Sequence, residues 1–580
     1  MLENSINSAI GVFLFAISVS MVLACGVSGP RAEPADMVLR GGRVVTVNDQ
    51  QPEGEAIAVR GSWIVAVGSD LEIDPYIGPN TKVIDLAGRL VVPGLIEGHG
   101  HFMSLGTSLT ILDLTGVSSW DGIVDMVEDA VAAAEPGEWI VGRGWHQEKW
   151  DGAPEPAVEG SPVHHSLSAV SRENPVLLGH ASGHAAFANA MAMQLGGLSQ
   201  SSAAPAGGEL VRDGQGELTG LLREKAQRPV WAAVEASRAD RSPEEIDAER
   251  RRLVELAGAA ALAKGITSFH DAGASFETID FFRQLEQEGS LPIRLYVMVR
   301  RQSNDEMNAR LPDYRMVAEG DDFLTVRSIK RQIDGALGAH GAWLLEPYED
   351  LPESIGLVLE PEDDIRGTAE VAIRHGFQVN THAIGDRANR RVLDIYEEVF
   401  LENDSPADLR WRVEHAQHLH PEDVGRFVEL GVIASMQGIH CTSDGPWVFK
   451  RLGDERAQRD SYLWRELIDS GAVVTNGTDV PVEDIDPIAS FYASVSRQML
   501  NGDSFYPEHS MTREEALRSY TLNNAYAAFE EELKGSLEPG KLADIVVLDR
   551  DIMNVPEEEI PATKVDFTIV GGKIRYESGG

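Results

Sequence analysis

The sequence predicts an α/β fold: a distorted TIM-like (β/α)8 barrel with a small β-sandwich domain built from both chain ends. Three observations support this fold class. Short apolar segments alternate with helical segments through the centre, hairpin patterns occupy both ends, and histidines or acids follow several of the apolar segments. Strand–helix alternation is typical of parallel sheets, and polar residues at strand outlets are typical of barrel active sites.

The composition is that of a large and unusually acidic globular protein. The chain has 580 residues, of which 43% are hydrophobic and 24% are charged, so it is long enough for a barrel and a smaller companion domain. The formal net charge is -42 at pH 7, with acidic residues spread along the chain. Because such a charge repels phosphates, we expect no nucleic acid partner.

The first 25 residues differ from the rest and indicate an export signal. Residues 10–25 carry no charge and are mostly apolar, and the run is shorter than the roughly 20 residues that a membrane helix needs. Its ending, Val22-Leu-Ala-Cys25, resembles a bacterial lipobox, in which Cys25 would be lipidated and become the mature N-terminus. We therefore expect an exported lipoprotein, periplasmic or on the cell surface, anchored to a membrane through Cys25, with residues 26–36 as a tether.

Two features leave a plain signal peptide and an uncleaved anchor open as alternatives. Leu23 is bulkier than the residue usual at that position of a lipobox, and the segment before the apolar run contains Glu3 but no basic residue. The lipoprotein is the expectation because it accounts for the position of Cys25.

Hydrophobic hairpin patterns lie at both ends of the chain. Four segments run or alternate apolar, mostly beside turn-forming glycines: residues 37–47, 56–67, 543–548 and 567–576. Neither end is large enough to bury a core alone. We therefore expect residues 37–90 and 533–580 to pair into one β-sandwich, with the barrel over residues 91–532.

The barrel region alternates predicted strands and helices. Its strand candidates, all short apolar runs, are residues 89–96, 139–142, 265–269, 293–298, 324–326, 377–380, 411–413, 432–435 and 472–475. Helical patterns separate many of them, as at residues 243–263 and 364–374. The segment from about 103 to 265 is longer than one barrel unit, so we expect an inserted lid or cap there.

His99 and His101 form a His-x-His pair at the end of the first predicted barrel strand. Residues two apart on a strand project from the same face, so both imidazoles can reach one cation. Gly98 and Gly100 leave room for it. Alone, such a pair is also compatible with two unrelated polar residues at a strand end.

Four further side chains that can bind metal lie at or near the ends of other predicted strands: Lys330, His382, His415 and Asp479. Because the carboxyl ends of barrel strands meet at one mouth, we expect them to converge with the histidine pair. Taken singly, they could be a solvated lysine, two hydrogen-bonded histidines and a helix-capping aspartate. His418 competes with His415, but residues three apart cannot share a strand face.

Several motifs in a fixed order resemble the amidohydrolase superfamily, and in particular its YtcJ-like branch, also called the amidohydrolase 3 group. The motifs extend over nearly the whole mature chain and are residues 93–101, 142–145, 182–189, 216–224, 330–338, 414–417, 478–482 and 535–544. Such a series is more specific than any one motif. Glu97 and Gly98 stand where the branch often has Asp and a small residue, a departure that leaves the ligand positions intact.

The resemblance implies hydrolysis of carbon–nitrogen bonds other than peptide bonds, in small amides or N-substituted formamides. It also implies one or two divalent metal ions, usually zinc. By the motifs, His99, His101 and Asp479 would hold the first ion. His382 and His415 would hold the second.

The resemblance further assigns roles to Lys330 and Asp479. Lys330, carboxylated by carbon dioxide, would bridge the two ions, whereas with a single ion it could be unmodified. A bound divalent ion lowers the pKa of water to about 7, which makes hydroxide available to attack the substrate carbonyl. Asp479 would take the proton as general base and pass it to the departing nitrogen as general acid.

Two interpretations stay open. His184, in the segment expected to be inserted, either contacts the substrate or is a packed, hydrogen-bonded histidine, and His180 and the pair His270 and Asp271 are similarly ambiguous. The protein could also be a catalytically inactive, exported ligand-binding lipoprotein on the same fold. All six ligand positions are filled, which favours the enzyme.

Overall fold

The computed structural model describes residues 32–403 and 408–579. The predicted signal segment, the lipobox with Cys25 and most of the tether lie outside the described residues, so the lipid anchor and the exported location stay predictions. Within the two described ranges, no helix combines the length and the apolar character needed to cross a bilayer.

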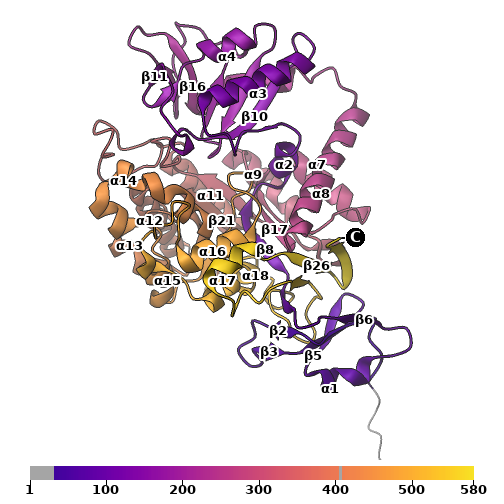
Figure 1. Cartoon of the computed structure of the whole chain (residues 1–580). Helices are drawn as coiled ribbons and strands as arrows, with labels where there is room; N and C mark the ends of the chain where they lie inside the picture. Colours follow the sequence, from indigo (N-terminus) through magenta and orange to yellow (C-terminus); the bar gives the residue numbers. More distant parts are fainter. Residues whose placement is uncertain (1–31, 404–407, 580) are drawn as a thin grey trace, which may run out of the picture.

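The centre of the molecule is a barrel of parallel strands, which confirms the predicted fold class (Figure 1). In spatial order, which is also chain order, its strands are β8 (Leu95–Gly100), β17 (Ile266–Ala274), β18 (Arg294–Val299), β20 (Leu324–Gln332), β21 (Gln378–Ala383), β22 (Arg412–His415), β23 (Ile433–Gln437) and β24 (Val474–Gly477). Nearly every strand residue is buried, as expected for strands packed on both faces.

Helices connect and follow these strands. They are α2 (Phe102–Ser108), α7 (Pro243–Ala263), α8 (Phe276–Gln287), α9 (Asn304–Tyr314), α11 (Glu362–His375), α12 (Asp386–Glu402), α13 (Pro421–Leu430), α14 (Gly438–Asp460), α15 (Trp464–Ser470), α16 (Pro487–Ser496), α17 (Arg513–Ser519) and α18 (Leu522–Ala527). Local signals set their ends: Ser242 and Glu245 form a capping box at the start of α7. Gly376 and Gly431, with φ of 69° and 64°, end α11 and α13 and turn the chain into the next strand.

The first and last barrel strands meet without a regular ladder. The backbone N–H of Asp479 donates to the carbonyl of His99 and that of His101 donates to the carbonyl of Val480, both at 2.8 Å. Buried Glu97 accepts two further hydrogen bonds across the same junction, from the backbone N–H and the hydroxyl of Thr478. The barrel is thus closed by strand ends that also carry three of the predicted metal ligands.

Both chain ends contribute to two further sheets beside the barrel. One sheet has the order β5 (Trp63–Gly68), β4 (Ala56–Arg60), β1 (Met37–Arg40) and β6 (Lys82–Asp85), and the other has the order β27 (Lys573–Glu577), β26 (Val565–Val570), β25 (Ile545–Leu548), β7 (Leu90–Pro93), β2 (Arg43–Val45) and β3 (Glu53–Gly54). Side chains from both sheets, among them Leu39, Ile57, Val91 and Ile545, form one apolar core. The sheets therefore make the expected β-sandwich, while the exact domain boundaries stay a prediction.

The predicted strand over residues 89–96 is two strands in the structure. The chain leaves β7 of the sandwich and enters β8 of the barrel at Gly94. A Cβ atom at Gly94 would lie 2.2 Å from the hydroxyl of Thr267, so the close approach of the two sheets requires glycine here. The run looks continuous in the sequence because both strands are equally apolar.

Most of the segment between β8 and β17, from β9 to α6, forms a layer of its own on the barrel, away from β2, β3, β5 and β6 (Figure 1). Its sheet has the order β15 (Gly208–Arg212), β16 (Leu218–Glu224), β14 (Ala185–Ala188), β13 (Val176–His180), β10 (Ile140–Trp145) and β9 (Leu112–Asp113). Helix α3 (Trp120–Ala133) covers one face, and α5 (Ala190–Leu195) and α6 (Arg228–Ala236) cover the other. The prediction of a barrel strand over residues 139–142 was wrong, because residues 140–142 begin β10 of this inserted sheet.

A buried ion pair joins the barrel to the sandwich. The guanidinium of Arg294, at the start of β18, contacts both carboxylate oxygens of Asp544, with Nε–Oδ2 at 2.8 Å and Nη2–Oδ1 at 3.1 Å. The two side chains are 2% and 4% exposed. An Asp544→Asn variant should therefore lose about 3–5 kcal/mol of stability, because it leaves a buried arginine without its counter-ion. Urea denaturation measures the loss.

The matched control is Asp49→Asn, which breaks the exposed ion pair between Asp49 and Arg518. Exposed pairs contribute about 0–1 kcal/mol, so this variant should unfold close to the wild type. Equal denaturation midpoints for the two variants would contradict a stabilising role for the buried pair.

Candidate active site

One cavity of about 100 Å³ lies at the carboxyl ends of the barrel strands. All the side chains predicted to bind metal or substrate line it: His99, His101, Lys330, His382, His415, Asp479 and His184. The inserted layer supplies part of the wall, including His146, Lys149 and His180. The structure thus brings together residues that are spread over most of the sequence.

His99, His101 and Asp479 form the tightest group. One possible ligand atom of each lies within 4.8 Å of those of the other two. Asp479 Oδ1 lies 3.3 Å from His101 Nε2 and 3.6 Å from His99 Nε2, and this buried oxygen has no partner with hydrogen-bond geometry among the described residues. A carboxylate oxygen that faces two imidazoles without a hydrogen bond fits a cation between them.

His382 and His415 form a second pair beside the first group. Their ring centroids are 4.5 Å apart, and the rings of His415 and His99 are 4.7 Å apart. His415 Nδ1 lies 2.7 Å from Gln437 Oε1, a contact that puts the proton on Nδ1 and leaves a lone pair on Nε2. His382 Nε2 is buried, lies 3.5 Å from Asp334 Oδ1 and has no hydrogen-bond partner among the described residues, which again fits a metal ligand.

Lys330 points into the same space from β20. Its amine lies 3.1 Å from His99 Nε2, and the residue is 3% exposed, which rules out a solvated surface lysine. Burial, together with the nearby charge of Arg300, lowers the pKa of Lys330 to about 7. The side chain is therefore available as a neutral amine at physiological pH.

The protonation states suit a metal centre. Burial holds the pKa of His382 and of His415 well below the usual value and lowers that of His101 to about 4, so these rings are neutral at pH 7. Burial alone would raise the pKa of Asp479, but the neighbouring His101 and His99 bring it well below its usual value. Neutral imidazoles and an ionised carboxylate are the forms that bind a divalent ion, so the donor set fits such an ion.

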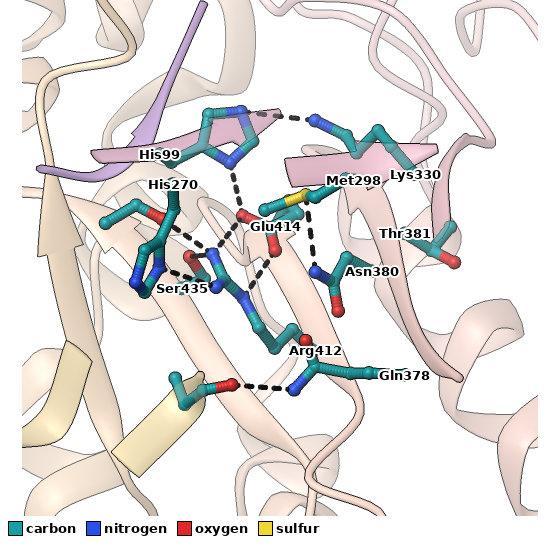
Figure 2. Close-up of polar contacts among 12 residues, drawn as sticks. His99, His270, Met298, Lys330, Gln378, Asn380, Thr381, Arg412, Glu414 and Ser435 are labelled. Carbon is teal, nitrogen blue, oxygen red and sulfur yellow. Dashed lines mark hydrogen bonds and ion pairs between the residues drawn. The ribbon is translucent and has the colours of Figure 1, made fainter. Parts of the chain in front are cut away.

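Behind the ligands, an ion pair fixes the orientation of His99 (Figure 2). Glu414 Oε2 accepts a short hydrogen bond from His99 Nδ1 and lies 3.0 Å from Arg412 Nη2. Arg412, fully buried, also donates to the carbonyl of Gly98 and the hydroxyl of Ser435, both at 2.7 Å. Burial would raise the pKa of Glu414, but the charge of Arg412 and the hydrogen bond from His99 hold it well below its usual value.

Arg412 and Glu414 were not among the functional residues predicted from the sequence. The available signal was alternation in β22, where Arg412 and Glu414 stand two apart and so face the same way. A carboxylate that holds the second nitrogen of a histidine fixes its tautomer and its orientation toward a metal. The arrangement therefore leaves His99 Nε2 free to act as a ligand.

His184 comes from the inserted layer and reaches the ligands. Its ring centroid is 5.4 Å from that of His382, and its Nδ1 lies 2.9 Å from Glu224 Oε1. Burial would lower the pKa of His184, but Glu224 more than offsets this and raises it. His184 is thus both hydrogen-bonded and exposed to the cavity.

The remaining histidines that the sequence left ambiguous have separate places. His418 contacts the Ser461 hydroxyl at 3.0 Å and does not line the cavity, so it does not compete with His415. His180 lines the cavity, whereas His270 does not line it and contacts Arg412 at 3.2 Å.

Two of the predicted ligands have strained backbones. Asp479 and His415 have φ of 55° and 75°, and Ala416 follows with φ of 41°. Positive φ is uncommon for residues with a side chain, costs roughly 1–3 kcal/mol each, and is concentrated at functional sites. Both side chains line the cavity, so the strain lies at the candidate site.

Curated relatives match almost the whole chain. The protein LONG AFTER FAR-RED 3 of Arabidopsis thaliana is 34% identical over 94% of this chain and 92% of its own length. An N-substituted formamide deformylase of Arthrobacter pascens is 27% identical over 94% of this chain and 99% of its own length. The chain is therefore similar to these proteins from end to end.

A solved structure agrees with the fold. An uncharacterized metal-dependent hydrolase from Pyrococcus horikoshii has a TM-score of 0.70 and 25% identity, over 90% of this chain and 99% of its own. Together with the family, this similarity indicates a divalent metal ion. The sequence profile of the amidohydrolase family matches residues 82–576. This chain therefore belongs to the amidohydrolase family, as its motifs predicted, and is a hydrolase of the class that acts on carbon–nitrogen bonds.

Proposed function

We propose that the protein hydrolyses the carbon–nitrogen bond of small amides, of the N-substituted formamide type, with the help of one or two divalent ions. The observation that carries the proposal is the convergence of His99, His101 and Asp479, with the buried Asp479 Oδ1 lacking a hydrogen-bond partner among the described residues. The similarity to a formamide deformylase supports this substrate type.

The first ion would be held by His99, His101 and Asp479, and a second by His382 and His415. Nitrogen and carboxylate donors of this kind suit zinc, which is the ion that we expect. A divalent ion at this site would lower the pKa of a water molecule and polarise the substrate carbonyl.

Lys330 would bridge the two ions as a carboxylated lysine. Only a neutral amine can attack carbon dioxide, and burial lowers the pKa of Lys330 to about 7, so the reactive form is abundant. Carboxylation adds a carboxylate to a side chain whose amine already lies 3.1 Å from His99 Nε2. The modified residue would then supply oxygen ligands to both ions.

Asp479 and His184 would handle protons and orient the substrate. Asp479 Oδ1 would accept the proton of the attacking water and deliver it to the departing nitrogen, which leaves as a neutral amine. His184, held by Glu224 at Nδ1, would donate from Nε2 to an oxygen of the substrate. Because Glu224 raises the pKa of His184, the ring more readily carries the proton that this contact needs.

The test combines metal analysis with activity. The purified protein should contain one or two equivalents of a divalent metal and hydrolyse N-substituted formamides or other small amides. A chelator should abolish turnover, and added zinc should restore it. Stoichiometric metal without chelator-sensitive hydrolysis across a broad amide panel would favour the inactive ligand-binding alternative.

A further inference from the structure

Arg300 is a cation in the cavity that the proposed chemistry does not use. It directly follows β18, at a strand outlet, and lines the cavity together with the ligands. Its side chain makes one hydrogen bond, from Nη2 to Gln332 Oε1 at 2.7 Å. Among the described residues, no carboxylate oxygen lies within the 4.0 Å of an ion pair with its guanidinium.

The acids that line the cavity are already engaged. Asp444 Oδ2 accepts hydrogen bonds from Gln417 and Tyr462, both at 2.9 Å. Glu483 accepts from the Ser443 hydroxyl at 2.6 Å and lies 3.8 Å from the amine of Lys149. Together with Asp479, which faces His99 and His101, these are the acids of the cavity wall. Arg300 is thus left without a counter-ion of its own.

The charge of Arg300, a half-buried residue, has no anion beside it among the described residues. Burial lowers its pKa to about 10, so it is still protonated at neutral pH, with Asp271, Asp479 and Glu360 attracting it only from a distance. Arginine has five N–H donors, and Gln332 occupies one. Charges that are withdrawn from water are normally paired in proteins, and a half-buried guanidinium that opens onto a cavity can obtain its partner from a ligand.

We propose that Arg300 binds a carboxylate of the substrate, so that the preferred substrates are N-acyl compounds with a carboxylate close to the scissile bond, such as N-formyl or other N-acyl amino acids. This inference rests on the proposed amide hydrolysis. Water adds across the carbon–nitrogen bond, so an N-formyl amino acid gives formate and the free amino acid.

The surroundings of Arg300 fit this role. The planar guanidinium matches a carboxylate through two parallel hydrogen bonds, and Gln332 fixes its orientation. It lines the same cavity as Lys330 and His101, two of the proposed metal ligands. Apolar lining side chains leave room for the side chain of an amino acid: Ala336, Leu337, Ile384, Trp447 and Val482.

The experiment compares N-formylphenylalanine, in both enantiomers, with the matching amide, N-formylphenylalaninamide. The metal-loaded wild type should prefer one enantiomer of the acid over its amide by about 30-fold or more in kcat/KM. Arg300→Gln should remove this preference, mainly by raising KM for the acid, while the amide loses much less. Arg301→Gln, which removes the neighbouring exposed charge, should leave both rates unchanged.

Gln332→Glu provides a second variant that keeps Arg300. The introduced carboxylate would form an ion pair with the guanidinium of Arg300 in place of the substrate. This variant should therefore also lose the preference for the acid. Equal losses for acid and amide in Arg300→Gln would instead mean that Arg300 only supports the site, and would overturn the inference. So would a wild type that prefers the amide.

Binding separates this inference from the proposed function. Calorimetry on metal-loaded Asp479→Asn protein should show at least 10-fold tighter binding of the acid than of the amide, and equal Kd values would overturn the role of Arg300. If the wild type hydrolyses no amide at all, the proposed function fails, while the calorimetric comparison still decides whether Arg300 binds carboxylates.

Discussion

Replacing Asp479 by Asn should lower kcat for amide hydrolysis by about 100- to 10,000-fold while metal content stays near that of the wild type. Asn keeps the size of the side chain and an oxygen that can face the ion, but its amide cannot accept the proton of the attacking water. Steady-state kinetics and elemental analysis of the same preparation measure both quantities. Unchanged turnover would refute the role of Asp479 as the base.

Two further variants separate proton transfer from other effects. Asp479→Ala removes the oxygen as well, so it should lose metal in addition to activity. Glu483→Gln removes a carboxylate from the same cavity that is bonded to Ser443 rather than aimed at the ligands, and should cost less than about tenfold. Equal losses in Glu483→Gln and Asp479→Asn would point to the overall charge of the cavity instead.

Replacing Glu414 by Gln should weaken metal binding by about 10- to 100-fold and destabilise the protein by about 3–5 kcal/mol. The carboxylate of Glu414 both holds His99 at Nδ1 and neutralises the fully buried Arg412. An amide leaves the arginine without a counter-ion and the histidine without its charged partner. Competition with a chelator measures the first effect, and denaturation of the metal-free protein measures the second.

A double variant tests whether the two effects are separate. Combining Glu414→Gln with Arg412→Met removes the unpaired charge, so part of the stability should return. Metal affinity should stay low, because His99 still lacks its carboxylate. Recovery of both properties together would show that Glu414 acts on the metal only through the stability of the barrel.

The positions that supply ligands could be predicted because each lies at or near the carboxyl end of a strand. His99, His382 and His415 are polar residues at or near the end of short apolar runs, and the carboxyl ends of parallel strands in a barrel share one mouth. The residues that support them are harder to find. The contact of His99 with Glu414 joins strands 315 residues apart, and it depends on barrel closure and on how the two strands are aligned, which local patterns do not determine.

Errors in the strand prediction have the same origin. Residues 139–142 and the strands of the barrel are equally short and apolar, so periodicity cannot tell which sheet a strand joins. Similarly, Arg300 reads in the sequence as one of two adjacent arginines. Only the folded chain distinguishes the one that lines the cavity from Arg301, which is exposed.

The junction between β8 and β24 gives the proposed ion a mechanical role in addition to its chemistry. His99 and His101 lie on one side of this junction and Asp479 on the other, where a few hydrogen bonds replace a regular ladder. A cation bound by all three would cross-link the two edges and close a loop that contains nearly all of the barrel. Metal binding and closure of the barrel would then be one coupled equilibrium. In the metal-free protein, the barrel would separate most easily between β8 and β24.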